Sequence, residues 1–151
     1  MLLNSWYAHV KAANKLFDNQ TDEGMMREIA PGRNRMVYLL GHLAAVHDAM
    51  LPLLGFGERR YADLDEAFLK NPDRAIENIP SVAELRAAWT KTNETLEGHF
   101  EKLSPNEWMM KHTAVSEEDF AKEPHRNRLN VLISRTAHMA GHNGQMALLK
   151  N

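Results

Sequence analysis

Apolar residues recur every three or four positions in four stretches of the chain, a spacing typical of helices that bury one face. Residues 3–17 form the first stretch, and residues 36–54 form the second, which closes with a proline and a glycine. Residues 82–103 and about 127–149 form the third and fourth stretches. The pattern therefore predicts four long helices, the first of which is amphipathic, with apolar residues at Leu3, Trp6, Tyr7, Val10, Ala13 and Phe17.

Helix-start signals support the third helix and add a short one. Ser81 is followed three residues later by Glu84, which is the spacing of a capping box. Ser104 predicts another helix start, with Pro105 at the first helical position and Glu107 at the third, but the apolar pattern soon ends in a polar stretch. We therefore expect a short helix and a loop before the last long helix.

The segment between the second and third helices, residues 55–80, is expected to be a long crossover. Its glycines and prolines leave room for at most a short helix around residues 63–70. No segment alternates polar and apolar residues over enough positions to predict a sheet strand, and no internal repeat is visible. Four long helices with one long crossover predict an all-α fold, a four-helix bundle.

The composition is that of one compact soluble domain. At 151 residues the chain has the usual size of a single domain, which we expect to span residues 1–151. A formal net charge of -2 without a basic stripe argues against a nucleic-acid partner. The chain has no cysteine, which excludes disulfides, thiolate metal ligands and a cysteine nucleophile, but it has eight histidines.

The N-terminal stretch lacks the features of a targeting segment. Asn4, Ser5 and His9 interrupt the apolar run that a secretory signal requires. No run approaches the roughly 18 to 20 apolar residues that cross a bilayer. The sequence therefore predicts a cytoplasmic protein with no membrane partner.

The last helix carries two histidines, His138 and His142, four positions apart. At about 100° per residue they lie roughly 40° apart on the helix surface. The same side carries Val131, Ser134, Gln145 and Leu149. Because this side includes apolar residues, we expect it to face inward. A buried imidazole needs a partner for each ring nitrogen, and a divalent metal ion would satisfy one nitrogen of each histidine.

A third histidine, His42 on the second helix, completes a candidate metal site. It shares its helix face with Tyr38, Leu39, Ala45, Val46, Ala49 and Leu53, so we expect it to point at the core. His47 lies about 140° from that face, and we expect it to meet solvent or another subunit. An i, i+4 histidine pair plus a third imidazole predicts a three-histidine metal site.

Other interpretations of these residues stay open. Side chains or water within the bundle would also satisfy the three imidazoles, and the run HMAGH lacks the glutamate of the zinc-protease motif. Of the remaining histidines, we expect His9 at the surface or the boundary of the core, and His99, His112 and His125 in solvent. The methionines fit core filling better than soft-metal binding.

Three glycines flank the candidate ligands: Gly41, Gly141 and Gly144. Each costs a helix about 1 kcal/mol relative to alanine. They either allow a backbone or a ligand to approach closely or reflect sequence drift in a tolerant helix.

With these residues in place, the chain resembles the DinB-like superfamily, also called the DinB/YfiT-like metalloenzymes. The resemblance lies in GHLAAVHDAM on the second helix, SVAELRAAWTKTNETLEGHFEKLS on the third and LISRTAHMAGHNGQMALL on the last, and it covers nearly the whole chain. Its most specific element is H-x-x-x-H-x-x-Q, formed by His138, His142 and Gln145, together with His42. The run MAGHNGQ differs from the family's more usual EIHHRGQ-like run in lacking charged residues.

The resemblance implies an up-down-down-up order of the four helices, a divalent metal ion held by His42, His138 and His142, and a homodimer. Some relatives are thiol transferases that use bacillithiol, mycothiol or glutathione, and others are thiol-dependent isomerases. Many have no assigned activity. The class of reaction therefore stays open between transferase, isomerase and hydrolase.

These expectations define a metal-dependent enzyme that acts on a small molecule. Three neutral imidazoles leave a coordination position open for a thiol, a water or a substrate oxygen, and zinc and nickel both suit imidazole ligands. Because the chain lacks cysteine, a thiol nucleophile has to come from a low-molecular-weight thiol cofactor. The competing prediction is a non-catalytic helical bundle that binds a metal or ligand, of a kind related to stress or damage response.

Four further polar residues are candidates for supporting roles. Gln145 could brace the site or contact a ligand, and Tyr38 could supply a hydroxyl near the metal, with ordinary inner-face packing as the alternative for both. Asp48 and Glu66 are candidate general bases whose placement the sequence does not define.

Overall fold

The computed structural model describes residues 2–149, and within this range the chain is helical. No strand forms among these residues beyond two isolated β-bridges. The all-α prediction is therefore confirmed, while residue 1 and residues 150–151 of the expected domain lie outside the described part. The helices, in chain order, are α1 (Leu2–Asp18), α2 (Asp22–Met25), α3 (Met36–Asp48), α4 (Met50–Leu53), the 3₁₀ helix η1 (Ala62–Leu64), α5 (Asp65–Phe68), α6 (Val82–Phe100), α7 (Pro105–Trp108), α8 (Glu117–Lys122) and α9 (Arg128–Met146).

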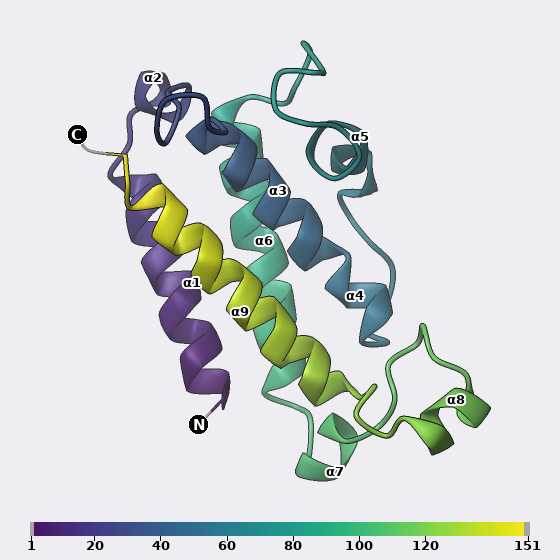
Figure 1. The fold of residues 1–151 in the computed structure, drawn as a ribbon. Coiled ribbons are helices and arrows are strands. Elements are labelled where there is room, and N and C mark those ends of the chain that lie inside the picture. The colour runs from purple at the N-terminus through teal and green to yellow at the C-terminus, as the bar shows by residue number, and fades with distance from the viewer. Residues whose placement is uncertain (1, 150–151) are drawn as a thin grey trace.

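Four of these helices are long, and they lie alongside one another (Figure 1). Helix α3 packs mainly against α6, and α1 packs mainly against α9, while α3 and α9 also touch. Helix α3 is buried on nearly all sides because other elements cover it from several directions. Only Tyr38, His42 and Val46 on this helix keep appreciable exposure, and their i, i+4, i+8 spacing makes one stripe.

The apolar character of α3 and α4 has a structural explanation. Met36–Leu53 is long and apolar enough to cross a membrane by length and composition alone, which corrects the expectation that no run approaches that length. However, 67% of this window is buried inside the protein. A helix that is hydrophobic all round is the expected centre of a bundle, and burial against the other helices accounts for its composition.

The second predicted helix is interrupted, which corrects its expected continuity over residues 36–54. Helix α3 ends at Asp48, and α4 begins at Met50. Pro52 explains the break, since it has no N–H to donate and its ring crowds the carbonyl of residue 48, one turn earlier. The other predicted boundaries agree closely with the structure, including the capping box of Ser81 and Glu84 at the start of α6.

The crossover between α4 and α6 is fastened to α3 by a buried ion pair. Asp48 has no solvent exposure and accepts hydrogen bonds from Arg59 Nε (3.0 Å) and from the backbone N–H groups of Arg60 and Tyr61. Arg59 also pairs with Asp65 at the start of α5. These contacts hold η1 and α5 against α3 and thereby place Phe68 beside the exposed stripe of that helix.

Candidate metal centre

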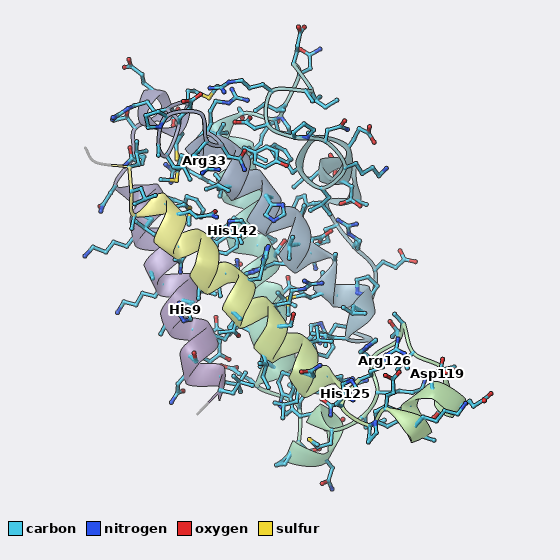
Figure 2. The ribbon with its side chains drawn as sticks, viewed as in Figure 1. His9, Arg33, Asp119, His125, Arg126 and His142 are labelled. Atoms are coloured by element: carbon cyan, nitrogen blue, oxygen red, sulfur yellow. The ribbon has the colours of Figure 1, made fainter. Side chains whose placement is uncertain are left out.

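Three histidine side chains meet between α3 and α9. His42 comes from α3, and His138 and His142 come from successive turns of α9. The Nε2 atom of His138 lies 3.2 Å from Nε2 of His42 and 3.0 Å from Nε2 of His142. One ligand atom from each residue lies within 4.8 Å of the others. In Figure 2, His142 lies midway along the long helices, whereas His125 lies far away beside Arg126 and Asp119.

Hydrogen bonds on the outer ring nitrogens orient two of these imidazoles. His42 Nδ1 lies 2.9 Å from the carbonyl oxygen of Phe68, which can only accept, so Nδ1–H is the donor. His142 Nδ1 lies 2.8 Å from Oε1 of Gln145 and donates in the same way. A neutral imidazole that carries its proton on Nδ1 has a free lone pair on Nε2. Both rings therefore direct a lone pair toward His138.

The environment favours the uncharged form of His42 and His138. Burial lowers the pKa of His42 below its usual value and lowers the pKa of His138 to about 4. The nearby His142 and the positive charge of Arg135 lower both pKa values further. Since metal coordination requires neutral imidazole, this environment favours the form that binds a cation.

The donor set fits a divalent metal ion. Tetrahedral coordination with metal–nitrogen bonds of about 2.0–2.1 Å places nitrogen ligands roughly 3.3 Å apart, close to the Nε2 separations of 3.0 and 3.2 Å. Without a cation, the converging lone pairs repel, and His138 has only one proton to share between two neighbours. Within residues 2–149 no aspartate or glutamate joins the cluster, so three neutral ligands would leave at least one coordination position open.

The two residues predicted to support the site take different roles. Gln145 braces His142, as its hydrogen bond to Nδ1 shows. Tyr38 does not aim its hydroxyl at the cluster, because that hydroxyl donates to the carbonyl of Asn71 at 2.8 Å. Instead, the Tyr38 ring lies parallel to His42, with an interplanar angle of 10° and ring centroids 6.2 Å apart. Tyr38 therefore covers one face of His42 and restricts its rotation.

The inner face of α9 differs from the predicted one. The buried positions are Leu132, Thr136, Met139, Asn143 and Met146. Ser134 and Gln145, which were expected on the inner face, are exposed, and His138 and His142 are half-buried. The physical reason is that α9 packs mainly on α1, and the histidines lie on its flank toward α3. Because α9 contacts both α1 and α3, its buried residues and its site residues lie on different sides, and one apolar stripe cannot predict both.

The prediction for His47 is wrong. This residue has no solvent exposure and lies between the rings of Trp6 and Trp89, whose centroids are 4.6 and 4.8 Å from its own. Its Nδ1–H donates to Oδ1 of Asn93 at 2.9 Å, and burial lowers its pKa to about 3. Angular position on α3 was misleading because α6 covers the side opposite His42. The half-exposed stripe carries the site, and the fully buried stripe carries His47.

The two carboxylates considered as general bases lie in other interactions. Asp48 belongs to the buried pair with Arg59, and Glu66 is bonded to Lys70 and Asn71. Neither belongs to the three-histidine group.

The remaining histidines also stand apart from this group. His9 is half-buried and His125 is exposed, as expected, but His99 and His112 are half-buried and not fully solvated. His99 stacks on Phe56 with ring centroids 4.5 Å apart. The difference arises because the loop after α4 brings the Phe56 ring onto His99. The spacing of residues along the helix cannot reveal such a contact.

Two contributors to the site, the Phe68 carbonyl and Arg135, escape the sequence analysis, while the role of a third, Gly41, is one of the two that it left open. The carbonyl of Phe68 orients His42, although it comes from the crossover. Gly41 allows this contact, since a Cβ there would lie less than 3.0 Å from the Phe68 ring, whereas Gly141 and Gly144 have open space at the corresponding position. Arg135 lies one turn before His138 on α9. Because residues three apart on a helix are neighbours, this spacing could have placed the arginine beside the candidate ligands from the sequence alone.

Comparison with known proteins identifies one family that covers nearly the whole chain. A family model described as the DinB superfamily matches residues 6–146. No curated protein matches the chain.

Proposed function

Because the chain belongs to the DinB superfamily and brings three imidazoles together, we propose that it is a metal-dependent enzyme whose ion is held by His42, His138 and His142. The observation that carries the proposal is the convergence of three Nε2 atoms, two of which have lone pairs fixed by outer hydrogen bonds. Zinc and nickel are the proposed metals because both suit neutral imidazole ligands.

The proposed chemistry is the activation of a low-molecular-weight thiol for transfer to an electrophilic small molecule. A bound divalent ion supplies Lewis acidity, which lowers the pKa of a thiol or water that it binds. The chain's own residues hold the ligands: the Phe68 carbonyl and Gln145 fix the proton positions of His42 and His142, and Tyr38 covers one ring. The absence of cysteine means that the thiol comes from outside the chain.

Metal analysis tests the binding part of this proposal. Protein expressed without affinity-nickel exposure is expected to hold about one divalent ion per chain, and His42→Ala or the pair His138→Ala, His142→Ala is expected to lose it. His9→Ala is the matched control, because His9 is a half-buried histidine outside the cluster. Equal and low metal contents in the wild type and the double variant would disprove the site.

A thiol panel tests the catalytic part. Metal-loaded protein is incubated with an electrophile such as a chlorinated aromatic compound and with cysteine, glutathione or bacillithiol in turn. We expect a thiol-dependent rate that His42→Ala abolishes. Identical rates for both proteins, with metal bound in the wild type, would instead identify a non-catalytic metal-binding bundle.

The finer features of the assembly are also proposals. We propose the up-down-down-up order for α1, α3, α6 and α9, which the course of the ribbon in Figure 1 supports. We propose a homodimer, which an exposed apolar residue on α9 and another just after it support, since Ile133 and Leu148 are 46% and 59% exposed. A cytoplasmic location remains a prediction. Light scattering of the purified protein tests the dimer, and a monomer at micromolar concentration would contradict it.

A further inference from the structure

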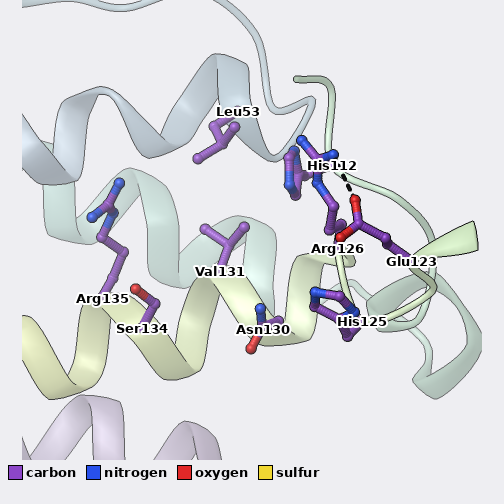
Figure 3. A pocket seen from close by; sticks show the side chains of 9 residues that line it. All are labelled: Leu53, His112, Glu123, His125, Arg126, Asn130, Val131, Ser134 and Arg135. Atoms are coloured by element: carbon purple, nitrogen blue, oxygen red, sulfur yellow. Dashed lines mark hydrogen bonds and ion pairs between the residues drawn. The ribbon is translucent and has the colours of Figure 1, made fainter. Parts of the chain in front are cut away.

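A pocket of about 460 Å³ lies where α4, α9 and the loop before α9 meet (Figure 3). Leu53 of α4 forms part of its wall, and Ser134 and Arg135 line it from α9. Figure 3 shows Arg135 at one end of the pocket, and His112 and Arg126 at the other end. The volume falls within the range of about 300–1,000 Å³ typical of small-molecule sites.

The pocket carries an uncompensated positive charge. Arg126 and Arg135 face a single acidic residue, Glu123, which pairs with Arg126 at 3.1 Å. Arg135 has no ion pair within residues 2–149, and its buried Nε atom has no hydrogen-bond partner there. A half-buried guanidinium without a counter-charge is costly, so an anion in the pocket would be favoured.

The charged end of the pocket is next to the three-histidine site. His138 follows Arg135 by three residues on α9, an axial rise of only about 4.5 Å. A ligand held by Arg135 would therefore extend along α9 toward the histidine cluster.

We propose that this pocket binds the carboxylate of the small molecule on which the protein acts, with Arg135 as its recognition residue. The Arg135 guanidinium presents two parallel N–H groups that match the two oxygens of a carboxylate. Ser134, beside Arg135, adds a hydroxyl. His112, at the other end of the pocket, offers a donor to the rest of the molecule, because its Nδ1 accepts from the N–H of Ala114 and its proton is therefore on Nε2. One net positive charge favours a carboxylate over a phosphate dianion.

The part of this inference that concerns turnover depends on the proposed function, whereas anion binding does not. The probes are 3-mercaptopropionate and its uncharged methyl ester, and dissociation constants are measured by NMR titration with metal-loaded and metal-free protein. We expect the wild type to bind the acid at least ten times more tightly than the ester in both forms. Arg135→Gln is expected to abolish this preference, and Arg135→Lys to restore part of it.

Arg128→Gln is the matched control, because Arg128 lies two turns earlier on α9, is half-buried, forms no ion pair within residues 2–149 and does not line the pocket. It is expected to keep the preference for the acid. The proposal is overturned if folded Arg135→Gln, checked by circular dichroism, still prefers the acid tenfold, or if the wild type shows no preference. A preference in metal-free protein that depends on Arg135 supports the pocket even if the protein holds no metal and shows no turnover.

Discussion

Replacing Gly41 by alanine tests whether the crossover orients the metal ligand on α3. By helix propensity alone, the change would stabilise the protein by about 1 kcal/mol. However, the new Cβ would lie less than 3.0 Å from the ring of Phe68, which is only 1% exposed and has no room to move outward without losing its burial. Overpacking of this kind costs about 1–3 kcal/mol. The expected net effect is a destabilisation of about 1 kcal/mol.

The same change is expected to weaken metal binding. If the Phe68 ring moves, its carbonyl moves away from His42 Nδ1, and the ring of His42 loses the hydrogen bond that fixes its proton. Loss of such a partner typically lowers metal affinity about 10–100-fold. Urea unfolding measures the stability, and competition with a chromogenic chelator measures the affinity.

Gly98→Ala on α6 is the control, since a Cβ at Gly98 meets no atom within 4 Å. It is expected to stabilise the protein by up to about 1 kcal/mol without altering metal affinity. If Gly41→Ala stabilises the protein as much as Gly98→Ala does and leaves metal affinity unchanged, the packing of Phe68 does not control His42.

Three more predictions address the brace, the buried histidine and the crossover. Gln145→Ala is expected to lower metal affinity about tenfold without changing the unfolding midpoint of the metal-free protein, as chelator competition and thermal melts will show. His47 has a folded-state pKa of about 3, below the unfolded value of about 6.5, so between these values only the unfolded chain binds the proton. Stability should therefore fall as the pH falls through this window, by up to about 1.4 kcal/mol per pH unit, and urea titrations should find a shallower slope in His47→Gln. Asp48→Asn removes the buried partner of Arg59, which keeps its ion pair with Asp65, and weakens the acceptor of two backbone N–H groups. It is expected to destabilise the protein by about 1–3 kcal/mol, and an unchanged melting temperature would be the contrary result.

The sequence predicted the helices well because their signals are local. The capping box at Ser81 and the apolar spacing of α6 depend only on neighbours within one or two turns, and both appear in the structure. The three histidines could be grouped by helical position together with the family resemblance, and the structure brings their nitrogens together. Their binding of a metal remains a prediction.

What the pattern missed depends on contacts between distant parts of the chain. The face of α3 that carries His47 is covered by α6 and by Trp6 of α1, so this helix is apolar nearly all round and its sequence does not reveal which stripe stays exposed. Likewise, the partner of His42 Nδ1 is a backbone carbonyl, which every residue has and which no sequence motif marks. Only the docking of the crossover determines which carbonyl reaches that ring.

The hydrogen bonds that orient His142 and His42 therefore form at different stages of folding. The brace of His142 lies within α9, so that part of the site can form as soon as one helix forms. The orientation of His42 has to wait until residues many positions further along have docked on α3. Tight metal capture should consequently appear late in refolding, as a kinetic signal that the slowest tertiary contacts are complete.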